Sequence, residues 1–193
     1  MATFGKTLVT GPTEEPVTVP EVCSHLRLED GEADPGLIDN YIRTARDVCQ
    51  NYLQRQFVTA TWDFFQDDFP VGGRAPYPVC LPPLQSVTTV KYYDTAGTQQ
   101  TWASSNYTLS TDTEPGKIEP NTDTYWPEAQ NRVDAVEIRG VVGYGGAGAV
   151  PETIKTAMKE LIRMWHDGDC IMGDIPDGIK ALLDVESWTV THG

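Results

Sequence analysis

Residues 34–65, DPGLIDNYIRTARDVCQNYLQRQFVTATWDFF, contain the change of pattern that decides the fold. Asp34 is suited to cap a helix whose first residue is Pro35. Nine apolar residues then recur at spacings of one, three and four, which predicts an amphipathic helix over residues 35–55. From residue 58, β-branched and aromatic residues alternate with polar ones, which predicts a strand over residues 58–65. The chain is therefore expected to change from helix to strand near residue 58.

A shorter helix is predicted before this one, from about residue 18 to residue 28. Thr18 and Glu21 have the spacing of a capping box, and Pro20 falls in the first turn, where a missing N–H costs little. Residues 1–17 contain glycine and proline at positions that disfavour a helix. We expect them to form an extended arm.

Short runs rich in β-branched and aromatic residues, separated by turn residues, follow residue 58. Their spacing predicts a compact antiparallel β region over residues 58–145, because short runs joined by tight turns pair with their neighbours. The expected strands after the first are residues 79–81, 86–93, 98–102, 107–110, 117–119 and 135–142.

A glycine-rich segment follows the last predicted strand and contains Gly143, Gly145, Gly146 and Gly148. Neither a Lys-Ser/Thr pair nor a G-x-G-x-x-G pattern accompanies it, so a phosphate-binding loop is disfavoured. We predict that these four glycines form a hinge. Helical spacing returns after the hinge and predicts one helix from residue 151 to about residue 165 and a short one over residues 177–183.

This order of helices, strands and helices predicts an α+β fold. The expected architecture is a helical core of about four helices, with an inserted antiparallel β region and extended termini. The two parts of the core, separated in the sequence, would pack together. The expected segments are an N-terminal arm at 1–17, the first part of the core at 18–57, the β region at 58–145, the second part of the core at 146–183 and a C-terminal tail at 184–193.

The chain is acidic throughout, with 28 Asp and Glu against 14 Lys and Arg in 193 residues. A protein that binds duplex DNA tightly needs clustered cations to neutralise phosphates, and no such cluster is found. The acidic balance favours solubility, or a surface past which DNA slides without binding. No apolar run approaches the roughly 18–20 residues that cross a bilayer, so we expect no membrane contact.

No catalytic constellation is recognisable, and we expect no enzyme activity, cofactor or metal. The four cysteines and three histidines are scattered without metal-ligand spacing. His166, Asp167 and Asp169 lie at a glycine-rich helix end, where solvated polar residues are ordinary, so a metal site there is disfavoured. The aromatic residues of the β region, among them Trp62, Trp102 and Trp126, permit a sugar-binding face but favour packing in a core or between subunits.

Six stretches, whose order and spacing span about residues 8–183, carry a resemblance to a known family. They are LVT to PVT followed by SHLRL at 8–28, LIDNYIRTAR and YLQRQ at 37–56, TWD, FP and LPPLQSV at 61–87, YYD and GT at 92–98, VGYG and VPETIK at 142–155, and GIKALL at 178–183. Together they resemble the head–tail connector proteins of long-tailed bacteriophages and gene transfer agents, also called adaptor or head-completion proteins. Residues 166–174 and the tail after residue 183 depart from the pattern.

The resemblance implies a non-enzymatic structural protein of the virion neck, made in the host cytoplasm. It implies a homo-oligomeric ring, usually of twelve copies, that docks beneath the portal protein. A stopper or tail-completion protein would bind below the ring. Double-stranded DNA would pass through the channel during genome ejection without specific binding.

The C-terminal tail, residues 184–193, is a candidate for the contact with the portal. Val185, Trp188 and Val190 give it apolar side chains near a free end, which suits docking into a groove or onto a strand edge. Two alternatives remain open at this stage. One is another tail or neck component, such as a tail-completion or baseplate protein, and the other is a carbohydrate-binding module.

Overall fold

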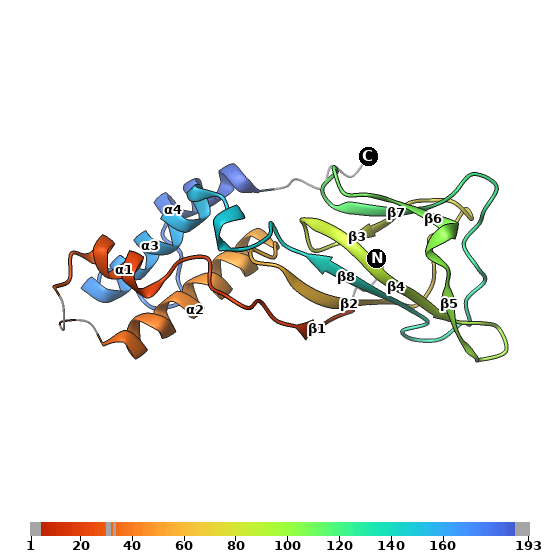
Figure 1. Cartoon of the computed structure of the whole chain (residues 1–193), viewed down its shortest axis with the longest axis horizontal. Coiled ribbons are helices and arrows are strands. Elements are labelled where there is room, and N and C mark those ends of the chain that lie inside the picture. Colours follow the sequence, from red (N-terminus) through yellow and green to blue (C-terminus); the bar gives the residue numbers. More distant parts are fainter. Residues whose placement is uncertain (1–4, 30–31, 33, 188–193) are drawn as a thin grey trace. The chain divides into compact units, whose positions relative to one another are not determined.

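The computed structural model describes residues 5–29, 32 and 34–187 (Figure 1). It confirms the predicted α+β class, because it contains four α-helices together with antiparallel sheets. The chain divides into two compact units. The strand unit comprises the described residues of Met1–Gly11 and Thr59–Gly143, and the helical unit those of Pro12–Val58 and Tyr144–Gly193.

The helical unit is built from α1 (Val19–Leu26), α2 (Pro35–Leu53), α3 (Glu152–Asp167) and α4 (Asp177–Leu183). Its core combines helices from both ends of the chain, because each helix has one apolar face and buries it against the others. The fully buried side chains of α2 and α3 include Ile38, Ile42, Ala45, Cys49, Ile154, Ala157, Met158, Leu161 and Ile162. None of the helices described is both long and apolar enough to cross a membrane.

The ends of α2 and α3 follow from local chemistry. Asp34 Oδ1 accepts a hydrogen bond from Gly36 N at 2.9 Å and so caps the start of α2. The helix ends at Leu53, two residues before the predicted end, because Gln54 adopts a left-handed conformation with φ of 52°. Gly168 ends α3 in the same way, with φ of 77°.

The strand unit contains a five-stranded antiparallel sheet in the order β1-β2-β8-β4-β5 and a three-stranded antiparallel sheet in the order β3-β7-β6. The strands are β1 (Gly5–Thr10), β2 (Ala60–Gln66), β3 (Tyr77–Val79), β4 (Leu84–Tyr93), β5 (Gln99–Trp102), β6 (Tyr107–Ser110), β7 (Gly116–Pro120) and β8 (Val136–Val142). The strand predicted at residues 79–81 was wrong in position, because the backbone bends at residues 80–83 and β3 lies before that bend.

The core of the strand unit lies between its two sheets. The two sheets approach closely at Gly116 of β7, since a Cβ atom there would lie 2.5 Å from Cβ of Leu84 in β4. Aromatic rings fill much of the remaining space. Phe69 stacks on Trp126 with 4.8 Å between ring centroids, and Trp102 stacks on Tyr107 at 5.4 Å.

The described part of the predicted N-terminal arm includes a strand that the sequence pattern did not indicate. β1 pairs with β2, with Leu8 opposite Trp62 and an irregularity between Leu8 and Thr10. β1 is an edge strand and most of its side chains are exposed. It therefore lacks the alternation of apolar and polar residues that identifies a half-buried strand.

Candidate functional site

A groove lies between α1 and α3 in the helical unit. Its α1 wall is fixed by a capping box. Thr18 N and Thr18 Oγ1 donate to Glu21 Oε2 at 2.6 and 2.7 Å, and Glu21 N donates to Thr18 Oγ1 at 3.4 Å. These bonds hold the pKa of Glu21 below its ordinary value, because they stabilise the carboxylate. The helix then ends where Arg27 takes a left-handed conformation with φ of 59°.

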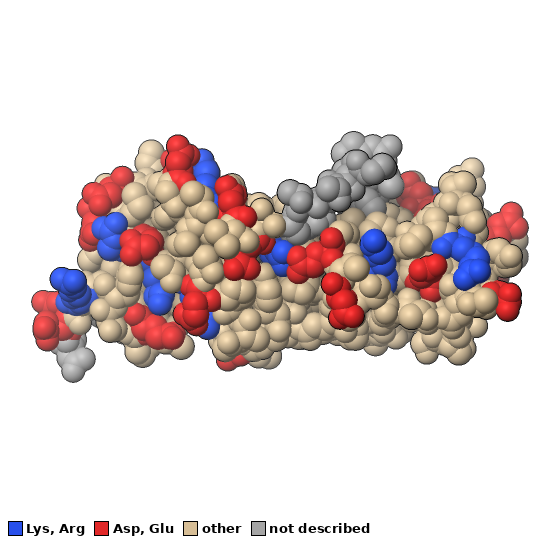
Figure 2. Space-filling model, turned by 90° about the horizontal axis from the view of Figure 1, so that it is seen from above, with Lys and Arg blue, Asp and Glu red and all other residues tan. Residues whose placement is uncertain are grey.

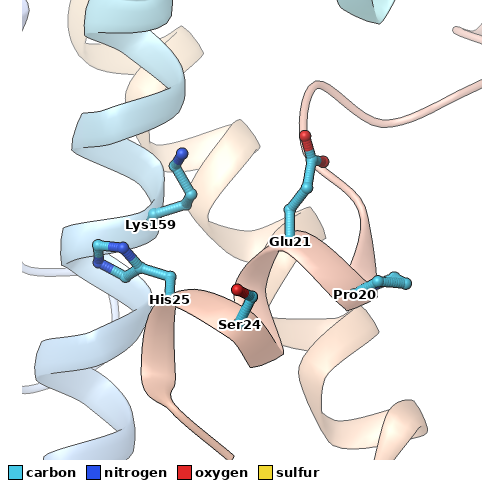
Figure 3. A pocket seen from close by; sticks show the side chains of 5 residues that line it. All are labelled: Pro20, Glu21, Ser24, His25 and Lys159. Carbon is cyan, nitrogen blue, oxygen red and sulfur yellow. The ribbon is translucent and has the colours of Figure 1, made fainter.

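The groove consists of two adjoining hollows that share His25. The first encloses about 440 Å³, and Lys159 of α3 lines it together with residues of α1 (Figure 3). The second encloses about 350 Å³ around the C-terminal end of α1. The lining residues of the first are Pro20, Glu21, Ser24, His25 and Lys159, and those of the second are His25, Leu26, Arg27, Glu160, Arg163 and Asp167.

Ionisable side chains form contacts across the groove and along its α3 wall. His25 Nε2 lies 3.1 Å from Glu160 Oε1, although without the geometry of a hydrogen bond. Arg163 Nε donates to Glu160 Oε2 at 3.0 Å, and its Nη1 donates to Asp167 Oδ2 at 3.1 Å. Bonds from His166 and then Arg163 hold the pKa of Asp167 below its ordinary value.

This arrangement is an open surface groove lined by charged side chains. Both hollows are open to solvent, so they would not exclude water from a reacting group. Within the described residues, no group of three or more His, Cys, Asp or Glu side chains could hold a metal ion. Asp167 and Asp169, weighed above as metal ligands with His166, instead pair with Arg163, whose Nη1 lies 3.1 Å from Asp167 Oδ2 and 3.8 Å from Asp169 Oδ2. His166 Nδ1 lies 3.3 Å from Asp167 Oδ1.

The predicted hinge glycines lie where the chain passes from one unit to the other, since the division falls between Gly143 and Tyr144. Gly143 and Gly145 have φ of 119° and 138°, values that other residues rarely adopt. Gly146 allows a close approach of Glu14, whose Oε1 accepts a hydrogen bond from Ala147 N at 2.7 Å. A Cβ at Gly148 would meet nothing within 4 Å. Whether this segment acts as a hinge stays a prediction.

The predicted portal-contacting tail is described only at its start. Val185 lies in a short 3-10 helix, Asp184–Glu186, and its side chain is 72% exposed. Trp188 and Val190 lie outside the described residues. The 3-10 helix is held by Asp184 Oδ1, which accepts from Tyr52 Oη at 2.8 Å, and by Glu186 Oε1, which accepts from Thr153 Oγ1 at 3.1 Å.

The tryptophans of the β region belong to the core of the strand unit. Trp102 and Trp126 are buried, and Trp62 packs against the same cluster. Trp126 Nε1 donates to the carbonyl oxygen of Ala75 at 2.9 Å, which satisfies its only polar group. These three rings therefore do not form an exposed sugar-binding platform.

The groove residues were not predicted as a site. His25 and Arg27 entered the sequence prediction only within the SHLRL stretch of the resemblance, and no role was predicted for Lys159 or Arg163. Cationic residues four apart along one predicted helix, Lys155, Lys159 and Arg163, were the available signal, although Lys155 is buried in the structure. Such a pattern ordinarily marks a solvated face, and only the packing of α1 beside it makes a groove.

Solved structures of other proteins share the fold of this chain over nearly its whole length. No protein-family model and no curated protein matches the sequence. Among solved structures, the chain is similar to one from "Virion of native gene transfer agent (GTA) particle", with 20% identity, a TM-score of 0.78 and coverage of 97% of this chain and 98% of that chain. It is similar to a chain from "Neck of empty GTA particle computed with C6 symmetry", with 23% identity, a TM-score of 0.77 and 98% coverage of both chains. A third, from "Neck of native GTA particle computed with C12 symmetry", has 20% identity, a TM-score of 0.71 and coverage of 99% and 98%. This chain thus shares its fold with chains of gene transfer agent particles, including two structures of the neck.

Proposed function

We propose that this protein is a structural subunit of a ring in the neck of a phage-like particle, acting as a head–tail connector. The observation that carries the proposal is the likeness in fold, over nearly the full length of both chains, to chains from gene transfer agent necks. The symmetries printed for those necks, C6 and C12, are those of rings. The resemblance noted in the sequence points independently to the same class of protein.

The partners follow from this proposal. The ring would bind the portal protein on one side and a stopper or tail-completion protein on the other, within the virion, after synthesis in the host cytoplasm. Figure 2 shows one face of the protein. Acidic and basic side chains of the described residues are scattered over this face, and no continuous basic stripe crosses it. With a net charge of −14, the ring would let DNA pass without holding its phosphates. No reaction is assigned to the chain.

The two alternatives have less support. Another neck or tail component would share the virion location, and the connector is preferred because of the ordered stretches of sequence that resemble connectors. A carbohydrate-binding module would need exposed aromatic rings, whereas Trp102 and Trp126 are buried in the core of the strand unit. A glycan array would test that alternative directly.

The proposal is tested by mixing the purified protein with its cognate portal protein and imaging the mixture by negative-stain electron microscopy. We expect an added ring on one end of the portal. A portal that stays bare at saturating protein concentration would refute the connector role. An isolated monomer would not, because an adaptor can assemble only on its partner.

A truncated chain tests the role proposed for the tail in the same experiment. Removal of residues 188–193 is preferable to removal of the whole predicted tail, because Asp184 and Glu186 bond to Tyr52 and Thr153 in the helical unit. We expect the truncated protein to keep its circular dichroism spectrum and to lose portal binding. Normal binding by the truncated protein would exclude residues 188–193, with Trp188 and Val190, as the portal contact.

A further inference from the structure

We propose that neighbouring copies bind head to tail through two complementary flanks of α3, an inference that rests on the proposed ring. The cationic flank is the α1–α3 groove with Arg27 and Lys159. The acidic flank consists of Asp174, Asp184 and Glu186, which lie before and after α4. The acidic flank of one copy would enter the groove of the next.

The two flanks face different directions from the same helix. Lys159 lines the groove beside α1, whereas Thr153 of α3 holds Glu186. Six residues separate them, which at 3.6 residues per turn places them about 120° apart around the helix axis. An interface between two different patches is heterologous, and it generates a ring where the rotation closes. A two-fold dimer would instead use one patch twice.

Two cations of the groove make no ion pair with the described residues of their own chain. Arg163 is occupied by Glu160 and Asp167. By contrast, neither Arg27 nor Lys159 has a carboxylate within 4.0 Å among the residues the structure describes, and Arg27 is exposed. Glu21 in the groove lining accepts from Thr18, and Lys159 acts on its carboxylate only from beyond ion-pair distance. Two cations of the groove are therefore free to bind incoming carboxylates.

The acidic flank is complementary and already ordered. Asp184 and Glu186 accept hydrogen bonds from neutral hydroxyl groups, and Asp174 Oδ1 accepts from Ile175 N at 3.0 Å. No described cation lies within 4.0 Å of these three carboxylates, whereas Asp177 between them pairs with Lys180 at 3.2 Å. Their charge is held in place but not neutralised, so pairing them costs little further ordering.

Apolar contact would add to the charge pairing. Val185 stands between Asp184 and Glu186 with its side chain 72% exposed. Pro20 and Leu26 supply apolar surface to the groove. A second copy is favoured as the occupant because each chain carries both carboxylates and groove cations that are unpaired among the described residues, so opposite charges can pair between copies that otherwise repel at a net charge of −14. Such pairs fix register and orientation more than affinity.

Cross-linking identifies the contact directly. A mixture of ordinary and ¹⁵N-labelled protein is treated with a carbodiimide, which joins an amine to a carboxylate that touches it, first on the portal and then as concentrated protein alone at low ionic strength. We expect a mixed-isotope peptide that joins Lys159 to Asp184 or Glu186. Mixed-isotope peptides that join only other surfaces, or a link from Lys159 to a different protein, would overturn the inference.

Charge-reversal variants test whether this contact contributes to assembly. Lys159→Glu should weaken the assembly of copies on the portal about tenfold or more in co-sedimentation at low salt, because an attraction becomes a repulsion. Lys117→Glu makes the same charge change on β7 of the strand unit and should have little effect. A chain with both Lys159→Glu and Asp184→Lys should regain association. Equal association of Lys159→Glu and Lys117→Glu would reject these flanks, while rings of wild-type protein on the portal would still support the connector role.

Discussion

Single residues show how closely the strand unit is packed. Gly116 is placed where no larger residue fits, since a Cβ atom would lie 2.5 Å from Leu84 Cβ and 2.7 Å from Leu84 Cδ2. The Leu84 side chain is buried, so it has little room to move away. The sequence placed Gly116 beside a predicted strand, but its neighbour comes from a strand 32 positions earlier in the chain.

Gly116→Ala is therefore expected to destabilise the protein by about 1–3 kcal/mol, the usual cost of overpacking a core. The free energy of unfolding in urea measures this, with near-ultraviolet circular dichroism to confirm the native state. Gly178→Ala is the matched control, because a Cβ there meets nothing within 4 Å and the residue lies in α4. We expect the control to raise stability by up to about 1 kcal/mol. Equal effects of the two variants would contradict the close approach of the sheets at Gly116.

At the scale of the element, the helices are determined mainly by local signals. Thr18, Glu21 and Asp34 form the caps predicted for them, and α2 begins at the predicted Pro35. The strands depend less on local sequence signals and more on pairing with distant strands. β4 runs to ten residues because β8 pairs along nearly its whole length, and β1 exists because β2 offers it an edge.

The capping box of α1 gives a prediction with a pH dependence. Thr18→Ala should destabilise the protein by about 1 kcal/mol at pH 7, because it removes the side-chain bonds to Glu21. Since the pKa of Glu21 is lowered in the folded state, this stabilisation is present above its unfolded pKa and is lost as the pH falls through the folded pKa.

Urea unfolding at pH 7 and near pH 3 tests this prediction. The difference between wild type and Thr18→Ala should shrink at the lower pH. Thr156→Ala, an exposed change in the middle of α3, serves as the control and should cost little at either pH. A difference that persists unchanged at low pH would show that the Glu21 carboxylate does not contribute to the cap.

At the scale of the whole molecule, the described residues form two hydrophobic cores rather than one. One core contains the apolar faces of the helices, and the other lies between the sheets. Leu161 is fully buried in the first core and Ile118 in the second. The chain crosses between the units near Gly11, Val58 and Gly143. Local unfolding of each unit is therefore expected to depend on its own core.

Leu161→Ala should remove about 2–5 kcal/mol of stability from the helical unit by leaving a cavity. Native-state hydrogen exchange should show faster exchange of the amides of α2 and α3, with smaller changes in β8. Ile118→Ala should give the reverse pattern. A uniform loss of protection over both units in either variant would mean that the two cores unfold together.

The sequence by itself determined the helical segments, most of the strands, the α+β class and the resemblance to connector proteins. It could do so because capping, periodicity and turn chemistry act over a few neighbouring residues. Only the tertiary structure decided that β1 joins a sheet, that Leu84 excludes a side chain at Gly116, and that Arg27 and Lys159 line one groove. These features depend on contacts between residues far apart in the chain, and no local pattern of residues records which distant partner completes them.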